Sequence, residues 1–181
     1  MAKFLIAVWP FASHYFPLIA IAHALRDRGH TVAFYSGRAA AATLTGQGFM
    51  HFPFQSVDEA EVERLMFARD SYASGRNPLQ LKALLRRWLL GTLPDQVRDL
   101  EPIVAEWQPD VIVSETSLWG PILVTGERAG LPVAVFSTVI SCLLPGPEAA
   151  PFRPWPARPN TPPAACWPEP LQHSANCLRR Y

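Results

Sequence analysis

The stretch that most constrains the fold runs from Lys3 to Gly37, at the start of the chain. It opens with a short apolar run of strand-forming residues that ends at Pro10, which is typical of a buried parallel strand. Apolar residues then recur at helical spacing, and a second apolar run follows at residues 31–35. A strand, a crossover helix and a second strand predict a right-handed βαβ unit. The loop after the first strand therefore lies at the carboxyl edge of the sheet, where such folds bind ligands.

Three residues predict where the helix of this unit begins and ends. Pro17 has the fixed φ that suits a first helical turn, and Ser13 is a candidate cap in front of it. Gly29 follows the last helical residues, where a left-handed residue is favoured. We therefore expect a helix that starts near Pro17 and stops before Gly29.

The rest of the globular part repeats this alternation of strands and helices. We expect strands near residues 3–9, 31–35, 49–53, 110–114 and 132–137, and helices near residues 38–47, 56–71, 78–93, 94–107 and 117–128. This order predicts an α/β fold with a doubly wound, parallel, Rossmann-like sheet.

Composition limits the class of protein. The chain has 181 residues, 49% of them hydrophobic, which suits one domain plus a tail; we expect a domain at residues 1–150 and a tail at residues 151–181. The net charge of +1 gives no reason to expect a nucleic-acid partner. The three cysteines show no metal-ligand spacing, and no apolar run is long enough to cross a membrane. We expect reduced thiols, no metal and a cytoplasmic location.

The tail differs sharply from the domain. Ten of the 19 prolines lie from Pro145 onward, and no hydrophobic period survives there. We expect no regular structure in this part. One hypothesis for residues 153–181 is a frameshift in a GC-rich gene that replaced the true continuation; the alternative is a native disordered tail.

Two motifs carry a resemblance to a known family. The first is WPFASHYFPLIAIAHALRDRGHTVAFYSG, with His14 three residues before Pro17 and an Arg-Gly-His turn at residues 28–30. The second is PDVIVSETSLWGPILVTGERAGLPVAVFST at residues 109–138, with a strand that ends in an acidic residue. Together they resemble the N-terminal half of GT-B fold, nucleotide-sugar-dependent glycosyltransferases of the UDP-glucosyltransferase and macrolide-glycosyltransferase kind.

The resemblance implies an acceptor-binding domain that takes part in single-displacement sugar transfer, with inversion, to a hydroxyl of a small lipophilic acceptor. It implies a nucleotide-sugar as co-substrate and no cofactor, provided that a donor domain is supplied. The His-Cys-Gly or His-Gly-Gly motif of that donor domain is absent from the sequence. The rival hypothesis is therefore a truncated, catalytically inactive fragment or a small-molecule binding module.

Two residues occupy the family's catalytic positions. His14 matches the base, and neutral imidazole can take a proton from a hydroxyl near neutral pH. Glu115 stands where the family more often has Asp, and a carboxylate there would orient the imidazole. The alternatives are a loop histidine without a task and a carboxylate that only favours a helix dipole. We also expect Ser137 at the same cleft.

In the resembling enzymes, apolar residues of this region line the acceptor pocket. The candidates here are Phe11, Phe67, Leu85, Trp88, Trp119 and Ile140. The alternative for each of them is core packing, since pockets and cores are both apolar.

Overall fold

The structure is a computed structural model that describes residues 1–67, 78–124 and 130–137. All of these residues belong to one compact unit that extends to Thr138. Several expectations fall outside the described residues: the boundary at residue 150, the proline-rich tail and the position of Ile140.

The described residues form one five-stranded sheet in which every pairing is parallel. Its strands are β1 (Lys3–Ala7), β2 (Thr31–Ser36), β3 (Met50–Pro53), β4 (Val111–Glu115) and β5 (Val133–Phe136). The order is β3-β2-β1-β4-β5, so the chain starts in the centre, runs to one edge and then returns to build the other half. This is the doubly wound arrangement that the sequence predicts, and its switch point lies between β1 and β4.

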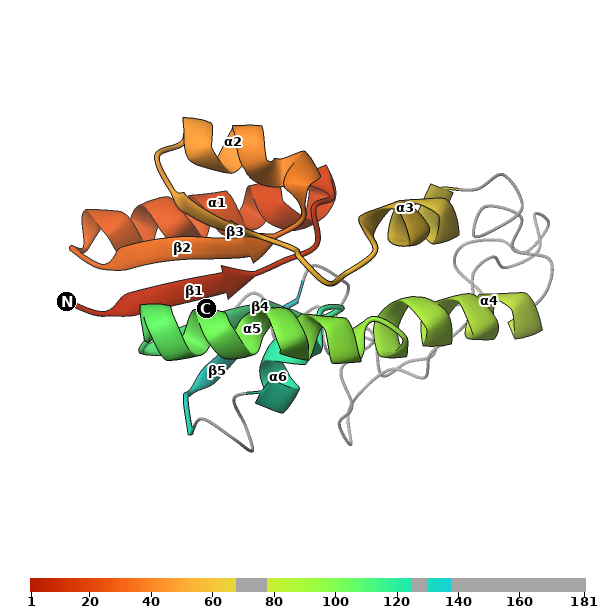
Figure 1. Ribbon diagram of the computed structural model, residues 1–181. Helices are drawn as coiled ribbons and strands as arrows, with labels where there is room; N and C mark the ends of the chain where they lie inside the picture. The colour runs from red at the N-terminus through yellow and green to blue at the C-terminus, as the bar shows by residue number, and fades with distance from the viewer. Residues whose placement is uncertain (68–77, 125–129, 138–181) are drawn as a thin grey trace, which may run out of the picture. The chain divides into compact units, whose positions relative to one another are not determined.

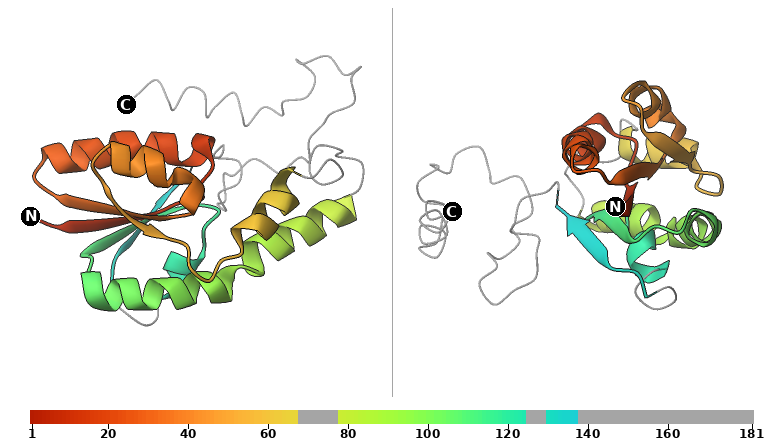
Figure 2. Two further views of the ribbon diagram at one scale, coloured as in Figure 1. Left: turned by 45° about the horizontal axis from the view of Figure 1, so that its top comes forward. Right: turned by 90° about the vertical axis from the view of Figure 1, so that its left-hand side faces the viewer.

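Helices cover both faces of this sheet. They are α1 (Ala12–Asp27), η1 (Arg38–Ala40), α2 (Ala41–Gly46), α3 (Glu59–Phe67), α4 (Pro78–Leu85), the π-helical turn η2 (Arg86–Leu90), α5 (Leu93–Trp107) and α6 (Gly120–Val124). Helices α1 and α2 lie on one face, and α5 and α6 lie on the other (Figures 1 and 2). No helix among the described residues is long and apolar enough to span a membrane.

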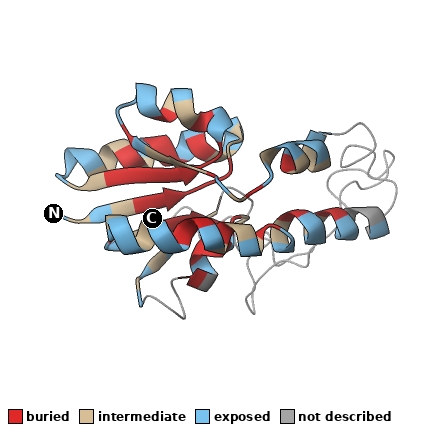
Figure 3. Cartoon of the chain, in the orientation of Figure 1, coloured by how far each residue is buried: buried red, intermediate tan, exposed pale blue. Residues whose placement is uncertain are grey.

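The central strand β1 shows why both faces need cover. Leu5 and Ala7 point into the core beneath α5, whereas Ile6 and Val8 point into the core beneath α1. Successive side chains of a strand face opposite sides of a sheet, so a run of apolar residues produces two apolar faces. The burial colouring shows the central strands as the most enclosed part of the molecule (Figure 3).

The structure corrects the predicted start of the first helix. Helix α1 begins at Ala12, Pro17 lies inside it, and neither Ser13 nor Phe11 caps it through a side chain. Proline lacks the N–H that would bond to the carbonyl of Ser13, four residues earlier, so the helix forgoes one bond there. Burial of Tyr15, Leu18, Ile19 and Ala22 on one side holds this turn in place. The predicted helix end is confirmed, with Gly29 at φ 81°.

Two other helices begin later than predicted. Helix α3 begins at Glu59 because Asp58 caps it, its Oδ1 accepting the backbone N–H of Glu61 at 3.0 Å. Asp99 on α5 also accepts the backbone N–H groups of Gln55 and Ser56 at 2.8 Å each, which holds the preceding segment as a loop. Helix α6 begins at Gly120, whose N–H donates to Gln96 Oε1 at 2.7 Å. A Cβ added at Gly120 would lie 2.4 Å from the Cβ of Gln96 and would collide with it, so this close approach needs glycine.

Candidate active site

A histidine and a carboxylate meet at the carboxyl edge of the sheet. His14 lies in the first turn of α1, and Glu115 is the last residue of β4, which pairs directly with β1. His14 Nδ1 lies 3.3 Å from Glu115 Oε2, within ion-pair distance. The Glu115 side chain is fully buried, whereas 19% of the His14 side chain is exposed. The fold thus brings together the two residues that the sequence singles out.

The contact between them is close but is not an aligned hydrogen bond. Nδ1 of His14 is buried and has no partner that satisfies hydrogen-bond geometry, although Oε2 of Glu115 is at hand. An ionised carboxylate can only accept, so the nitrogen facing it must carry the proton. Nε2 is then the nitrogen left to accept a proton.

Two hydroxyl groups hold the Glu115 carboxylate. Thr116 Oγ1 donates to Oε1 at 3.2 Å, and Ser117 Oγ donates to Oε2 at 2.5 Å. The Ser117 carbonyl in turn accepts the indole N–H of Trp9 at 2.9 Å. The sequence motifs do not single out Thr116 or Ser117. The signal that was available is the run Glu-Thr-Ser directly after a strand, where hydroxyl groups and a carboxylate necessarily lie close.

An apolar cleft of about 550 Å³ opens next to His14, whose ring contacts the lining residue Phe11, although neither His14 nor Glu115 lines the cleft itself. The loop after β1 and the start of α1 supply one wall, and α3 with its preceding loop supplies the other. The lining residues are Trp9, Pro10, Phe11, Ala12, Ser13, Ala39, Phe54, Glu59, Val62, Glu63 and Phe67, and we call this space the aromatic cleft. The Phe11 ring makes edge contacts with two other rings, at centroid distances of 5.6 Å to Phe67 and 5.4 Å to His14. Phe11 therefore connects the cleft to the histidine.

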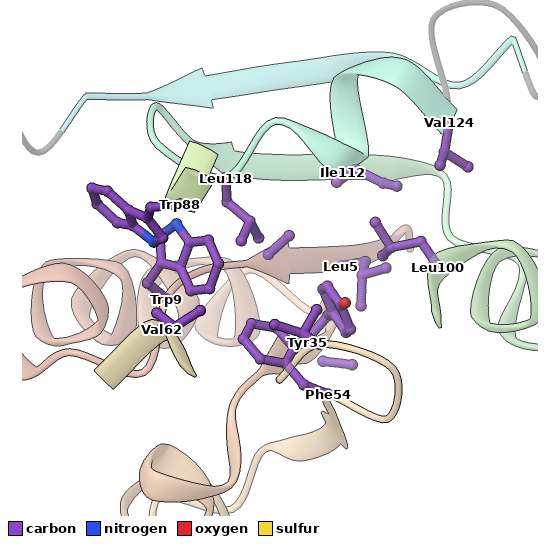
Figure 4. Packing of buried hydrophobic residues seen from close by; sticks show 13 residues of the cluster. Leu5, Trp9, Tyr35, Phe54, Val62, Trp88, Leu100, Ile112, Leu118 and Val124 are labelled. Atoms are coloured by element: carbon purple, nitrogen blue, oxygen red, sulfur yellow. The ribbon is translucent and has the colours of Figure 1, made fainter. Parts of the chain in front are cut away.

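The predicted acceptor residues fall into three groups. Phe11 and Phe67 line the aromatic cleft. Leu85 and Trp88 lie behind it in the core, where the Trp88 ring packs 5.6 Å from Trp9 (Figure 4). Trp119 is 38% exposed, is not among the lining residues and donates its indole N–H to the Thr116 carbonyl at 2.6 Å.

Ser137 follows β5 at the same edge of the sheet as Glu115, which pairs with the preceding Phe136. It therefore lies at the expected edge of the sheet, but it is not among the residues that line the aromatic cleft. Three lining residues of α3 were not predicted from the sequence: Glu59, Val62 and Glu63. Their spacing of i, i+3 and i+4 was the available signal, since it puts them on one helix face.

Glu59 holds α3 in position as a wall of the cleft. Its Oε2 accepts the backbone N–H of Arg38 at 2.8 Å, which ties α3 to the start of η1. Gly37 makes this possible, because a Cβ there would lie 2.3 Å from the same oxygen and 2.6 Å from Pro10. The wall of the cleft therefore depends on glycine at this position.

The remaining described histidines have structural surroundings. His30 Nδ1 accepts the backbone N–H of Ala2 at 3.2 Å, and His23 bonds to Gln47 and Arg26. His51 Nε2 lies 3.1 Å from the Ser36 carbonyl, and burial lowers its pKa, partly offset by that bond. Within the described ranges, no group of three or more His, Cys, Asp or Glu could hold a metal ion.

Comparisons with known proteins bear on the fold and on the class of protein. No protein-family model matches the sequence. The chain is 28% identical over 139 residues to 4'-demethylrebeccamycin synthase of Lentzea aerocolonigenes. This alignment covers 77% of this chain and 33% of that protein. The chain therefore spans about a third of the length of the curated relative it matches.

The solved structures point to the same class. SsfS6, a glycosyltransferase of Streptomyces sp. SF2575, aligns with a TM-score of 0.57 at 26% identity over 76% of this chain and 39% of its own. The spinosyn rhamnosyltransferase SpnG, solved with thymidine diphosphate, aligns with a TM-score of 0.58 at 20% identity over 84% of this chain and 37% of its own, which shows the fold. The chain is similar in sequence and in fold to part of the GT-B glycosyltransferases, which confirms the resemblance that its motifs indicate.

Proposed function

We propose that residues 1–137 form the acceptor-binding part of a glycosyltransferase that moves a sugar from a nucleotide-sugar to a hydroxyl group. The observation that carries this proposal is the 3.3 Å approach of His14 to Glu115 beside the aromatic cleft. The likeness to SsfS6, which has also been solved with thymidine diphosphate, supports a nucleotide-sugar as the donor.

His14 is the general base in this proposal. Its Nδ1 faces Glu115, so Nε2 takes the proton of the acceptor hydroxyl. The hydroxyl oxygen forms the new bond to the anomeric carbon of the sugar. The bond from that carbon to the phosphate oxygen breaks, and its electron pair leaves with the nucleoside diphosphate. Attack opposite the leaving group inverts the anomeric centre.

Glu115 is a positioning residue, since it acts through the imidazole. Its negative charge favours the imidazolium that forms when His14 takes the proton, and its fixed place selects the Nδ1–H tautomer. Full burial strengthens this effect, because little water screens the charge. The extra methylene of Glu relative to Asp does not prevent the contact.

The acceptor in this proposal is a small, lipophilic and preferably aromatic molecule that carries a hydroxyl. Aromatic rings make up much of the cleft, and apolar pockets with few polar groups recognise such ligands. A volume of about 550 Å³ lies in the range typical of sites for small organic molecules.

Binding of 2-naphthol, an apolar aromatic probe with one hydroxyl, tests the acceptor site on the full chain. We expect Phe67→Ala to weaken binding, because Phe67 lines the aromatic cleft. Phe16→Ala is the matched control, since Phe16 is another exposed phenylalanine and does not line the cleft. Equal affinity of wild type and both variants in calorimetric titration would contradict the assignment of the acceptor site.

Transfer is tested with the full chain joined to the donor-binding half of SsfS6, supplied with thymidine-diphosphoglucose and 2-naphthol. We expect naphthyl glucoside, detected by mass spectrometry, and none from the same fusion with His14→Ala. Binding of 2-naphthol without transfer in a folded fusion would favour the rival function, a non-catalytic small-molecule binding module.

A further inference from the structure

The residue that joins the carboxylate to the aromatic cleft is Ser117. Its hydroxyl donates to Oε2 of Glu115, the same oxygen that faces His14 Nδ1. Its carbonyl accepts the indole N–H of the fully buried Trp9, which lines the cleft. One residue therefore contacts the carboxylate through its side chain and the cleft wall through its backbone.

We propose that Ser117 is a positioning residue, whose hydroxyl fixes the plane of the Glu115 carboxylate and thereby the tautomer of His14. The inference rests on the proposed function for its catalytic consequence, but the positioning itself does not require turnover. Ser117 is not placed in contact with the acceptor or with the sugar.

The physical reason is the freedom of a terminal carboxylate. Its last torsion has a broad, roughly two-fold energy profile, so the oxygen that faces His14 needs a hydrogen bond of its own to stay in one position. The Trp9 bond fixes the backbone of Ser117 at its carbonyl, and the hydroxyl thus donates from an anchored position. A hydrogen bond to an ionised acceptor is about twice as strong as a neutral one.

Thr116 does not serve the same purpose. It donates to Oε1, the oxygen that does not face His14 in the ion pair. Oε2 carries both the Ser117 bond and the contact to Nδ1, so loss of the Ser117 hydroxyl acts directly on that contact. Thr116 is therefore the internal control for Ser117.

The test measures the tautomer of His14 in the full chain by ¹⁵N NMR of labelled histidine, at a pH at which the ring is neutral. The signal of His14 is assigned by its absence from His14→Ala. We expect the Nδ1–H form to dominate in wild type, in Ser117→Thr and in Thr116→Val. We expect Ser117→Ala to lose this preference, while the Trp9 bond to its carbonyl remains. Circular dichroism confirms that each variant is folded.

An unchanged tautomer in folded Ser117→Ala, or an equal change in Thr116→Val, overturns the inference. In a SsfS6-fused enzyme, Ser117→Ala should lower kcat by roughly tenfold to hundredfold, the range of one lost charge-assisted bond, with KM nearly unchanged. Ser117→Thr should restore kcat. A fusion in which His14→Ala leaves turnover intact contradicts the proposed function, whereas the NMR result still decides the role of Ser117.

Discussion

Two buried carboxylates of this chain lie in opposite chemical surroundings. The Asp99 cluster, formed by Tyr35, Gln55, Ser56 and Asp99, holds its carboxylate with two backbone N–H groups at 2.8 Å each and with the Tyr35 hydroxyl at 3.1 Å. The Glu115 cluster, formed by His14, Glu115, Thr116 and Ser117, holds its carboxylate with two hydroxyl groups and places an imidazole beside it.

The donors explain the difference in role. Backbone N–H groups cannot release a proton or turn away, so the Asp99 cluster fixes a loop and, beyond it, the cleft wall on α3. Burial, and then the charge of Asp99, raise the pKa of Tyr35 well above its ordinary value, which keeps its hydroxyl a donor. The Glu115 cluster instead contains an imidazole, a group that can both accept and release a proton. A buried carboxylate therefore suggests a catalytic role only when a side chain in contact with it can accept and release a proton.

The largest effect that we expect concerns the Glu115 cluster. His14→Ala should lower turnover of a SsfS6-fused enzyme by about 10²–10⁴, the typical contribution of a general base. Its unfolding free energy should change little, because Nδ1 makes no aligned hydrogen bond in the fold. Glu115→Gln should lower turnover less, since the amide oxygen can still accept from the imidazole. Near-normal turnover of folded His14→Ala would assign the residue to structure.

The next effect concerns the Asp99 cluster. Asp99→Asn keeps the shape but turns one acceptor oxygen into a donor, so at least one buried N–H or O–H group loses its partner. We expect the free energy of unfolding to fall by about 1–3 kcal/mol. Glu106→Ala is the control, because Glu106 is an exposed acidic residue on the same helix and should cost at most about 0.5 kcal/mol.

Urea unfolding of both variants makes the measurement. Equal stabilities for Asp99→Asn and Glu106→Ala would mean that the Asp99 cluster does not fix the loop after β3, and the contrast between the two clusters would fail.

A smaller effect sharpens the same contrast. Tyr35→Phe removes one of three donors to Asp99 and leaves both backbone donors in place. We expect a loss of about 0.5–1.5 kcal/mol in thermal or urea unfolding, the usual net value of one hydrogen bond. Turnover of the fusion should not change. A drop in turnover without loss of stability would show that the two clusters are coupled.

The smallest effect is a pH dependence at His51. Burial lowers its folded pKa below the unfolded value of about 6.5, so the native state favours the neutral ring. The stability that depends on this neutral form is present above that pH and is lost as the pH falls below it. His51→Gln should therefore reduce the drop in melting temperature between about pH 7.5 and about pH 5.5, that is, about one unit either side of the unfolded value. An unchanged drop would contradict this assignment.

Much of the fold follows from local pattern. The five apolar runs predict five parallel strands, and the structure differs at their ends by no more than a few residues, as β1 stops at Ala7 instead of residue 9. The predicted helix start at Pro17 was the clearest error, because tertiary packing of α1 outweighs the preference of proline for a first turn.

The sequence by itself determined the alternation of strands and helices and placed a histidine after the first strand and a carboxylate at the end of the fourth. These are local properties, set by side-chain period and by the direction of parallel strands. Only the tertiary structure decided that β4 pairs with β1, that Asp99 holds a loop 43 residues away at Ser56, and that the Ser117 carbonyl accepts the indole N–H of Trp9. Such contacts join residues far apart in the chain, and no local period encodes them, since they arise only when packed layers bring those side chains within bonding distance.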